Sequence, residues 1–389
     1  MTSTNEKSVS RPERMNVGVI GVGMIADTFI RNMTERFSIL NVSACASRRF
    51  ERAQETAERY GIEAKTIDEL LADPGIDIIV NLTPPEAHYS IIRRALESGK
   101  HVYTEKVLAG TLDEARELVR LADASSLELC SSPDTFLGSA IQNARQLVDR
   151  GMLGTVTSVH SSLTRNFRAI GELLPFVTQG VGGIGIDVAV YHLTALVYML
   201  GPIRSVFGYS RTNEPKRRHF MPALPHFGEE YEVTAKTVTA GVVEFECGTL
   251  GTMLFNSDSL VHQRPRFEMM GTSGILTLAN PDDFGGDVTL QREGQTTPIV
   301  VPSTFGMSAD TRGAGVAEMA WAIRTGRQPR ANKELAFHVL EALLGIDQAA
   351  AANQPYTMTS TAPVIAPLPE GHVTGLWVDD PESAFVDAL

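Results

Sequence analysis

The sequence predicts an α/β protein with two domains: a doubly wound parallel sheet, then an α+β domain with an open, mostly antiparallel sheet. Three features support this fold. Short apolar runs alternate with helical segments as far as Pro133. A glycine-rich turn joins the first strand to the first helix. From Ser205 onward, β-branched residues broken by Gly and Pro dominate. We place the domains at residues 15–133 and 134–389, after a disordered leader at residues 1–14.

The strands of the first domain are short and almost wholly apolar, which is typical of parallel strands covered on both faces. The expected strands are Val17–Ile20, Leu40–Ala46, Ile76–Leu82, His101–Thr104 and Leu127–Ser131. The expected helices between and after them are Met24–Glu35, Glu51–Tyr60, Glu86–Ser98 and Leu112–Ala124.

The second domain begins with a helix and then becomes rich in strands. The expected helices are Gly138–Arg150, a segment led by Asp187, Val316–Ile323 and Leu335–Ala352. The expected strands are Thr155–Thr164, Ser205–Tyr209, Thr234–Phe245, Thr249–Asn256, Arg266–Met270 and Ile275–Leu278. The segment Thr212–Glu230 has no period, and loops of that length often act as lids or oligomer contacts.

The segment NVGVIGVGMIADTF places Gly21-x-Gly23-x-x-Ala26 between a strand and a helix. Gly21 permits the tight turn, Gly23 lets the main chain approach a pyrophosphate, and Ala26 allows the helix to pack closely on the strand. The N–H groups at the helix start, around Met24 and Ile25, then face the phosphates. The pattern predicts a Rossmann domain that binds a dinucleotide. The alternative is a glycine turn in an unrelated α/β fold.

The second strand ends in Ala46-Ser47-Arg48-Arg49, where NAD sites usually place a carboxylate that accepts from the ribose hydroxyls. A hydroxyl and two guanidinium groups suit a 2′-phosphate instead. We therefore predict NADP, bound through Ser47 and Arg48, with NAD as the alternative. The other interpretation is that the arginines only decorate a helix start.

Thr83, Pro84 and His88 follow the strand Ile76–Leu82. In a doubly wound sheet this is the carboxyl end, where ligand crevices form. We expect these residues to contact the cofactor, and the alternative is a rigid turn with a surface histidine.

Four segments carry a family likeness: Gly21–Ala26, Thr83–His88, Val102–Lys106 and Gly182–His192. Their order and spacing resemble those of the Gfo/Idh/MocA oxidoreductases, over nearly the whole chain. The resemblance implies a Rossmann domain and a C-terminal α/β domain whose open sheet packs against a neighbouring subunit. It also implies sugars, inositols or related polyols as substrates.

The sequence departs from the family pattern after Glu105-Lys106, where Val107 replaces the usual proline. Proline would stiffen the turn that presents the lysine. Glu105 itself is expected to contact the nicotinamide ribose, as the family suggests.

A second departure concerns the family's Asp-x-x-x-His helix. The fourth residue after Asp187 is Tyr191, and His192 is the fifth. Residues four apart share a helix face, whereas one further step rotates by ~100°. Tyr191 therefore takes the acid/base position, as in the branch that resembles glucose–fructose oxidoreductase.

These residues predict a hydride-transfer site. Lys106 would stabilise negative charge on the reacting oxygen. Tyr191, with its pKa lowered by the ammonium, would relay the proton. Asp187 would orient the substrate or the lysine. His192 is expected to support the site residues or to pack in the core. In the alternative, His192 is the acid/base and Tyr191 is a core aromatic.

Substrate contacts are expected from Arg165 and Asn166, at the end of the strand Thr155–Thr164. No His/Cys/Glu constellation has metal-ligand spacing, so we predict no metal. The main functional hypothesis is an NADP-dependent sugar or polyol dehydrogenase or reductase. One alternative is a redox-neutral glycoside-processing enzyme with tightly bound NAD. The other is a non-catalytic nucleotide-binding regulatory protein, against which Lys106 and Asp187 argue.

The composition indicates which binding partners and which cell compartment to expect. A net charge of −12 disfavours nucleic acid or an anionic membrane. No apolar run is long enough to span a bilayer and the N-terminus is polar, so we expect a cytoplasmic protein. The cysteines Cys45, Cys130 and Cys247 form no CxxC pair and are expected to be buried thiols. The open sheet predicts a homodimer or homotetramer, because monomers rarely expose large apolar patches.

Overall fold

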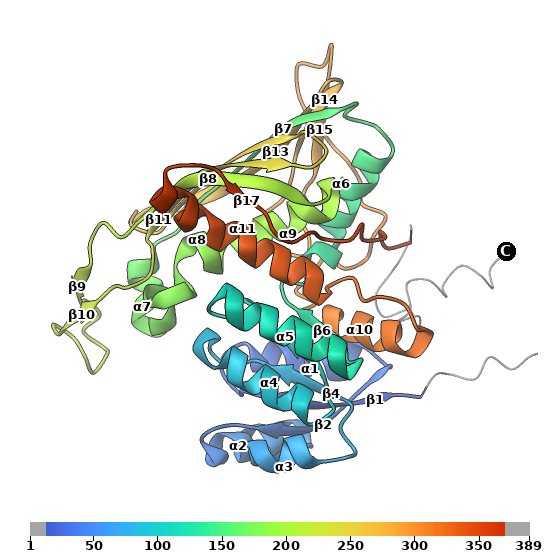
Figure 1. The fold of residues 1–389 in the computed structure, drawn as a ribbon, viewed down its shortest axis with the longest axis vertical. Helices are drawn as coiled ribbons and strands as arrows, with labels where there is room; N and C mark the ends of the chain where they lie inside the picture. The colour runs from blue at the N-terminus through green and yellow to red at the C-terminus, as the bar shows by residue number, and fades with distance from the viewer. Residues whose placement is uncertain (1–12, 370–389) are drawn as a thin grey trace, which may run out of the picture.

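The structure is a computed structural model that describes residues 13–369. Figure 1 shows a helix-covered sheet at one end of the molecule, a larger sheet at the other, and helices between them. Of the leader predicted at residues 1–14, only Glu13 and Arg14 lie within the described residues.

The first sheet has six parallel strands in the order β3-β2-β1-β4-β5-β6. Its strands are β1 (Met15–Ile20), β2 (Leu40–Ala46), β3 (Glu63–Lys65), β4 (Ile78–Asn81), β5 (His101–Thr104) and β6 (Leu129–Ser131). They are connected by α1 (Ala26–Arg36), α2 (Phe50–Tyr60), α3 (Ile67–Ala72), α4 (His88–Glu97) and α5 (Leu112–Ser125). The apolar residues of the central strands are buried, which confirms the doubly wound parallel sheet. The short elements β3 and α3 were not predicted.

The second sheet has nine strands in the order β16-β15-β14-β13-β7-β12-β11-β8-β17. They are β7 (Val156–Thr164), β8 (Ile203–Arg211), β11 (Val238–Phe245), β12 (Leu250–Asn256), β13 (Gln263–Gly271), β14 (Gly274–Thr277), β15 (Thr289–Arg292), β16 (Ile299–Val300) and β17 (Tyr356–Thr357). β7 and β12 pair in parallel and the other neighbours are antiparallel, which confirms the mostly antiparallel sheet. Phe245, Phe255 and Phe267 fill its inner face.

After β6, the described part of the chain contributes six α-helices. They are α6 (Ser139–Asp149), α7 (Phe167–Leu173), α8 (Ile184–Asp187), α9 (Ala189–Leu200), α10 (Ala314–Thr325) and α11 (Lys333–Ala352). α10 contacts α1 and β6, and α11 contacts α5 and β6 as well as β8. The late helices therefore pack on the parallel sheet, although the domain boundary at residues 133/134 stays a prediction.

α11 is long and apolar enough, by length and composition, to cross a membrane, which corrects our statement that no segment is. Its mean hydropathy is 1.3, and 56% of the apolar window is buried inside the protein. It lies against α5, α9 and β8. A helix covered on several sides is apolar on most of its faces, and this burial accounts for the composition.

Two smaller expectations need correction. The segment Thr212–Glu230 is not wholly irregular, because β9 (Lys216–Arg218) pairs with β10 (Glu230–Glu232) in an arm that projects from the molecule (Figure 1). Cys45 and Cys130 are buried as expected, whereas Cys247 is exposed. Cys247 lies in the turn between β11 and β12, where the chain reaches the surface.

Candidate active site

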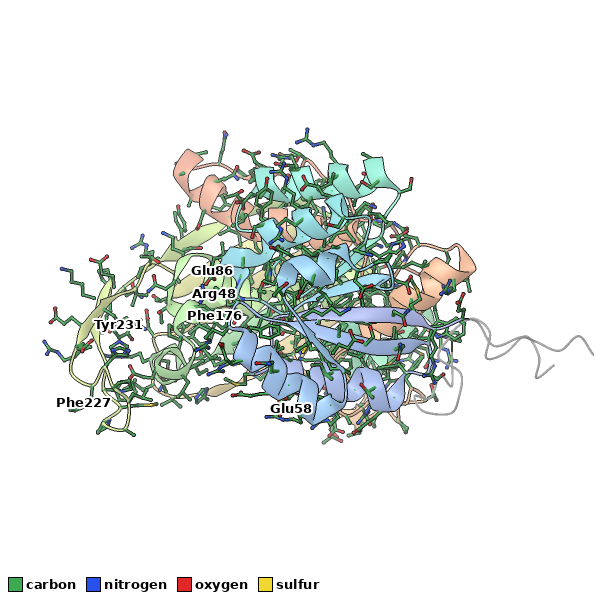
Figure 2. The ribbon with its side chains drawn as sticks, turned by 90° about the horizontal axis from the view of Figure 1, so that it is seen from below. Arg48, Glu58, Glu86, Phe176, Phe227 and Tyr231 are labelled. Carbon is green, nitrogen blue, oxygen red and sulfur yellow. The ribbon has the colours of Figure 1, made fainter. Side chains whose placement is uncertain are left out.

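The carboxyl ends of β1, β2, β4 and β5 meet at one edge of the parallel sheet. β1 and β4 are neighbours in the sheet, and the strand order reverses between them. Ligands of doubly wound sheets bind at such a switch point. Figure 2 shows Arg48, after β2, and Glu86, after β4, at the same end of the sheet. The predicted cofactor residues therefore come from neighbouring loops.

The glycine turn after β1 is shaped for a close approach. Gly21 has a φ of 97°, in the left-handed region, and a Cβ there would lie 2.7 Å from the main chain of Leu82. Both the conformation and the packing therefore require glycine at this position. A Cβ at Gly23 would meet nothing within 4 Å, so the space in front of Gly23 is open.

The start of α1 offers unused hydrogen-bond donors. No side chain caps the helix at Ile25. Among residues 13–369, no hydrogen bond occupies the N–H groups of Met24 and Ile25. Free N–H groups at a helix start attract an anion. The turn and the helix start therefore fit the pyrophosphate of a dinucleotide.

The end of β2 is polar and open. Ser47 is partly exposed and Arg48 is exposed, and neither forms an ion pair or side-chain hydrogen bond with another described residue. The strand end carries no carboxylate. The guanidinium of Arg48 is therefore free to meet a phosphate.

Asn81, at the end of β4, organises the loop that follows. Its Nδ2 donates to Thr104 Oγ1 at 3.0 Å, and its Oδ1 accepts from Thr83 Oγ1 at 2.7 Å. Thr83 is partly exposed and Pro84 is exposed, so a ligand can reach both. Asn81 was not predicted as a site residue, although a polar residue in an otherwise apolar strand was an available signal.

His88 lies below this loop and not on its surface. Its side chain is completely buried. Nδ1 and Nε2 lie 2.6 and 2.8 Å from the carbonyl oxygens of Val107 and Thr83. Burial lowers the pKa of His88, although the carbonyls oppose the shift. In place of the expected contact with the cofactor, the structure shows a histidine that supports two loops.

Lys106 and its partners join the two domains. The Nζ of Lys106 forms a short ion pair with Asp187 and lies 5.6 Å from the ring centroid of Tyr191. Beside it, Glu105 accepts a hydrogen bond from Ser132 Oγ at 3.1 Å. With valine following it, the lysine still reaches Asp187. The structure therefore brings together the three residues of the predicted hydride-transfer site.

The glycine-rich segment before Asp187 sets its position. A Cβ at Gly182 would lie 1.9 Å from the carbonyl oxygen of Phe176, and one at Gly185 would lie 2.1 Å from Thr239 Oγ1. A side chain at Gly185 would push α8 away from β11, and one at Gly182 would collide with the main chain of Phe176. The expected single helix is broken, because α8 ends at Asp187 and α9 begins after Val188. Even so, the spacing of four residues brings Tyr191 to the same lysine.

The charges of this cluster act on one another. Burial acts to lower the pKa of Lys106, but the negative groups around it, Asp187 first, outweigh burial and raise that pKa. Burial raises the pKa of Tyr191 well above its usual value, although Lys106 acts the opposite way. Our prediction of a lowered phenol pKa is therefore wrong, because desolvation of the phenolate outweighs the cation. At neutral pH both groups hold their protons.

His192 lies on the other side of α9. Its Nδ1 is 2.7 Å from Ser161 Oγ on β7. The rings of Phe255 and Phe267 pack against it edge to face, with centroids 5.0 and 5.2 Å away. Burial lowers the pKa of His192 to about 3. His192 is thus a neutral side chain packed on the sheet.

A second charged group lies beside Tyr191. Arg165 Nη2 donates to Asp282 Oδ2 at 3.1 Å, and Arg312 Nη2 donates to Asp282 Oδ1 at 3.1 Å. Asp282 raises the pKa of Tyr191 and Arg312 lowers it, so both act on the phenol. Asn166 instead caps α7, accepting from the backbone N–H of Ala169 at 3.1 Å. Sequence reasoning missed Asp282 and Arg312, which lie in loops without a motif.

Two family models match the chain. The one described as an oxidoreductase family with an NAD-binding Rossmann fold covers residues 15–131, and the GFO/IDH/MocA C-terminal domain covers residues 141–277. The D-xylose 1-dehydrogenase (NADP+) of Hypocrea jecorina is 31% identical, over 69% of this chain and 73% of that protein. The chain belongs to the Gfo/Idh/MocA family. It is an oxidoreductase that uses a nicotinamide dinucleotide.

Two further proteins extend the likeness. The dTDP-3,4-didehydro-2,6-dideoxy-α-D-glucose 3-reductase of Streptomyces violaceoruber is 32% identical, over 76% of this chain and 87% of that protein. A levoglucosan dehydrogenase solved with NADH and levoglucosan has a TM-score of 0.78 at 18% identity, covering 90% of this chain and 100% of that one. This structural likeness shows the fold. Within residues 13–369 of the Gfo/Idh/MocA chain, no group of three His, Cys, Asp or Glu side chains is placed to hold a metal ion.

Proposed function

We propose that this protein transfers a hydride between NADP(H) and a carbinol or carbonyl carbon of a sugar, polyol or glycoside. The observation that carries the proposal is the meeting of Lys106, Asp187 and Tyr191 after the carboxyl end of β5. The two sequence relatives support the substrate class, because one is a D-xylose 1-dehydrogenase and the other a reductase of a didehydro sugar nucleotide.

In this proposal each residue of the cluster has one task. The nicotinamide, when bound, supplies or accepts the hydride. Lys106 remains an ammonium and stabilises negative charge on the reacting oxygen. Asp187 holds the lysine in place through their ion pair. Tyr191 holds its proton at neutral pH and donates it when a carbonyl is reduced.

NADP is the proposed cofactor, with NAD also possible. The open guanidinium of Arg48 and the hydroxyl of Ser47 support a contact to the 2′-phosphate. Glu105, Thr83 and Pro84 are proposed to border the ribose and nicotinamide.

The substrate is proposed to lie between Lys106 and the charged group around Asp282. Arg165 and Arg312 offer N–H donors and Asp282 offers carboxylate oxygens, and all are partly buried, with side chains 26%, 17% and 19% exposed. Alternating donors and acceptors match a molecule with several hydroxyl groups. Asn166 is proposed to contribute through the position of α7.

The protein is proposed to be a homodimer or homotetramer, formed through the outer face of the large sheet. Inner residues of β11 and β12 are buried, whereas outer ones are exposed. The exposed outer apolar residues are Tyr209, Val242, Leu250, Leu254 and Ile275. A second copy would cover this face. We also propose a cytoplasmic location. The net charge of −12 supports the absence of a nucleic-acid or anionic-membrane partner.

The test is a screen of aldoses, inositols and glycosides, and of their keto forms, with each nicotinamide cofactor. The Lys106→Met variant serves as the control, because it keeps the length of the side chain and removes the charge. We expect turnover with at least one substrate, a fall of about 10²–10³-fold in the variant, and unchanged cofactor binding. Cofactor binding without turnover of any substrate would contradict the proposal.

A further inference from the structure

His88 makes contacts that the proposed reaction does not use. It is the first residue of α4, and its side chain is completely buried. Each ring nitrogen is within hydrogen-bond distance of a backbone carbonyl: Nδ1 of Val107 at 2.6 Å and Nε2 of Thr83 at 2.8 Å. Both carbonyls can only accept, so a neutral ring donates its one N–H to one carbonyl and places its other nitrogen against the second. In either tautomer one imidazole ring touches two loops at the carboxyl edge of the sheet.

The two loops have different tasks. Val107 follows Lys106 directly. A contact to the carbonyl of Val107 therefore restrains the main chain that carries the Lys106 side chain. Thr83 lies under the glycine turn, because a Cβ at Gly21 would lie 2.8 Å from the N of Thr83. A shift of the Val107 carbonyl thus moves Lys106, and a shift of the Thr83 carbonyl moves the glycine turn that is expected to hold the pyrophosphate.

Valine at position 107 restrains the turn after Lys106 less than a proline would. A proline after the lysine would restrict the turn through its ring, whereas valine leaves φ free. The Nζ of Lys106 lies at the end of four methylene groups, so its position depends on the main chain below it. A hydrogen bond to the carbonyl of Val107 restores the restraint from outside the turn.

We propose that His88 is a positioning residue, which fixes the Lys106 turn against the cofactor loop at Thr83. The inference rests on the proposed function, in which Lys106 acts on the reacting oxygen. His88 touches neither substrate nor cofactor, because it has no exposed surface. Its effect on turnover passes through Val107, and its effect on cofactor affinity passes through Thr83.

Two amide substitutions separate the contacts. In His88→Asn the side-chain amide nitrogen takes the place of Nδ1, and in His88→Gln it takes the place of Nε2. Asparagine can therefore donate to the carbonyl of Val107, and glutamine to the carbonyl of Thr83. His88→Leu can donate to neither. The matched control is His338→Asn, which changes a buried histidine that accepts from Ile203 N at 2.8 Å and lies 2.8 Å from Ser360 Oγ, away from the site.

The measurements are kcat, the Kd for the reduced cofactor by fluorescence titration, and the melting temperature. We expect His88→Asn to keep kcat within about 3-fold and to weaken cofactor binding by about 5–10-fold, the effect of one lost hydrogen bond. We expect His88→Gln to keep the Kd and to lose about 10–100-fold in kcat, because small misplacements of a catalytic group are costly. His88→Leu should show both losses, and His338→Asn only a lower melting temperature.

The two proposals fail in different ways. If the wild-type protein turns over but the Asn and Gln variants lose kcat and affinity in the same ratio, or lose neither, the role of His88 is overturned and the function stands. If the wild type turns over no substrate, the function fails. Crystal structures of the variants then decide the role of His88. The ion pair between Lys106 and Asp187 should persist in His88→Asn and be lost in His88→Gln, and its persistence in both would overturn the inference.

Discussion

Two adjacent residues of α9 can each carry a proton, yet their surroundings are opposite. Tyr191 faces Lys106, at 5.6 Å from its ring centroid. His192 faces the large sheet, with Ser161 Oγ at 2.7 Å and two phenylalanine rings around it. One residue step along α9 thus separates Tyr191, which lies at the Lys106 ammonium, from His192, which packs against the large sheet.

Removing the hydroxyl of Tyr191 tests this division. We expect Tyr191→Phe to fold normally and to lose about 10²–10⁴-fold in turnover, the range for a general acid or base. Tyr198→Phe is the control, because it removes another buried hydroxyl from the same helix, one bonded to Gln142 Oε1 at 3.0 Å. Equal losses in both variants, measured by steady-state kinetics, would assign the effect to the helix and not to the proton.

The pH profile gives a separate prediction for His192. Its pKa is lowered to about 3, so the ring stays neutral between pH ~5 and ~8. His192→Asn should therefore leave the shape of the pH–rate profile unchanged over that range. A limb near pH ~6.5 that disappears in this variant would make His192 the acid/base.

Cofactor choice is also decided by single residues. Arg48→Ala should weaken NADPH binding by roughly 1.5–3 kcal/mol, the scale of a hydrogen bond to a charged group, and NADH binding much less. Arg120→Ala changes an exposed arginine of α5 and is the control, which should leave both affinities unchanged. The Kd values come from fluorescence titration with both cofactors. Equal losses for NADPH and NADH in Arg48→Ala mean that this guanidinium does not read the 2′-phosphate.

At the scale of elements, Asp134 links the end of β6 to the start of α10. Its Oδ2 accepts from the backbone N–H groups of Gly313 and Gly315, each at 3.0 Å. Burial raises the pKa of Asp134 to about 6, although these donors and Arg312 oppose the shift. The folded protein therefore binds a proton here more readily than the unfolded chain does.

The sign of the pH effect follows from this raised pKa. The stability contributed by Asp134 is full below the ordinary pKa and is lost as the pH rises through about 6. Its loss between pH ~4 and ~7 amounts to roughly 3 kcal/mol at most. Asp134→Asn keeps an acceptor and removes the titrating carboxyl. The free energy of unfolding of this variant, relative to that of the wild type, should therefore increase as the pH rises over this range. Urea unfolding at several pH values measures the difference, and a constant difference would exclude the effect.

At the scale of the whole molecule, the outer face of the large sheet is the feature that a single copy leaves uncovered. Val242 is 50% exposed and Leu254 is 47% exposed, on neighbouring strands of that face. We expect wild-type protein to be a dimer or tetramer at micromolar concentration, and Val242→Glu to dissociate it, because the interface would bury a charge from each copy.

Light scattering after size-exclusion chromatography measures this change. Glu58→Lys alters an exposed residue of α2, on another part of the surface (Figure 2), and should leave the assembly intact. A monomeric wild-type protein would contradict the proposed interface.

The sequence by itself determined the parallel sheet, the glycine turn and the residues that lie at strand ends. These features are local, since the period of apolar residues reports which face of an element is buried, and glycine reports where the chain must turn. The spacing of four residues also indicated Tyr191 as the partner of Lys106, even though the helix is broken at Val188.

Only the tertiary structure decided what each side chain meets. Lys106 and Asp187 are 81 residues apart in sequence, and Asp282 and Arg312 lie in loops that no motif marks. The burial of His88 and the sign of the Tyr191 pKa shift were both mispredicted. A sequence shows which charges are present, but the net shift depends on how far the fold removes each group from water, and that is set by residues distant in the chain.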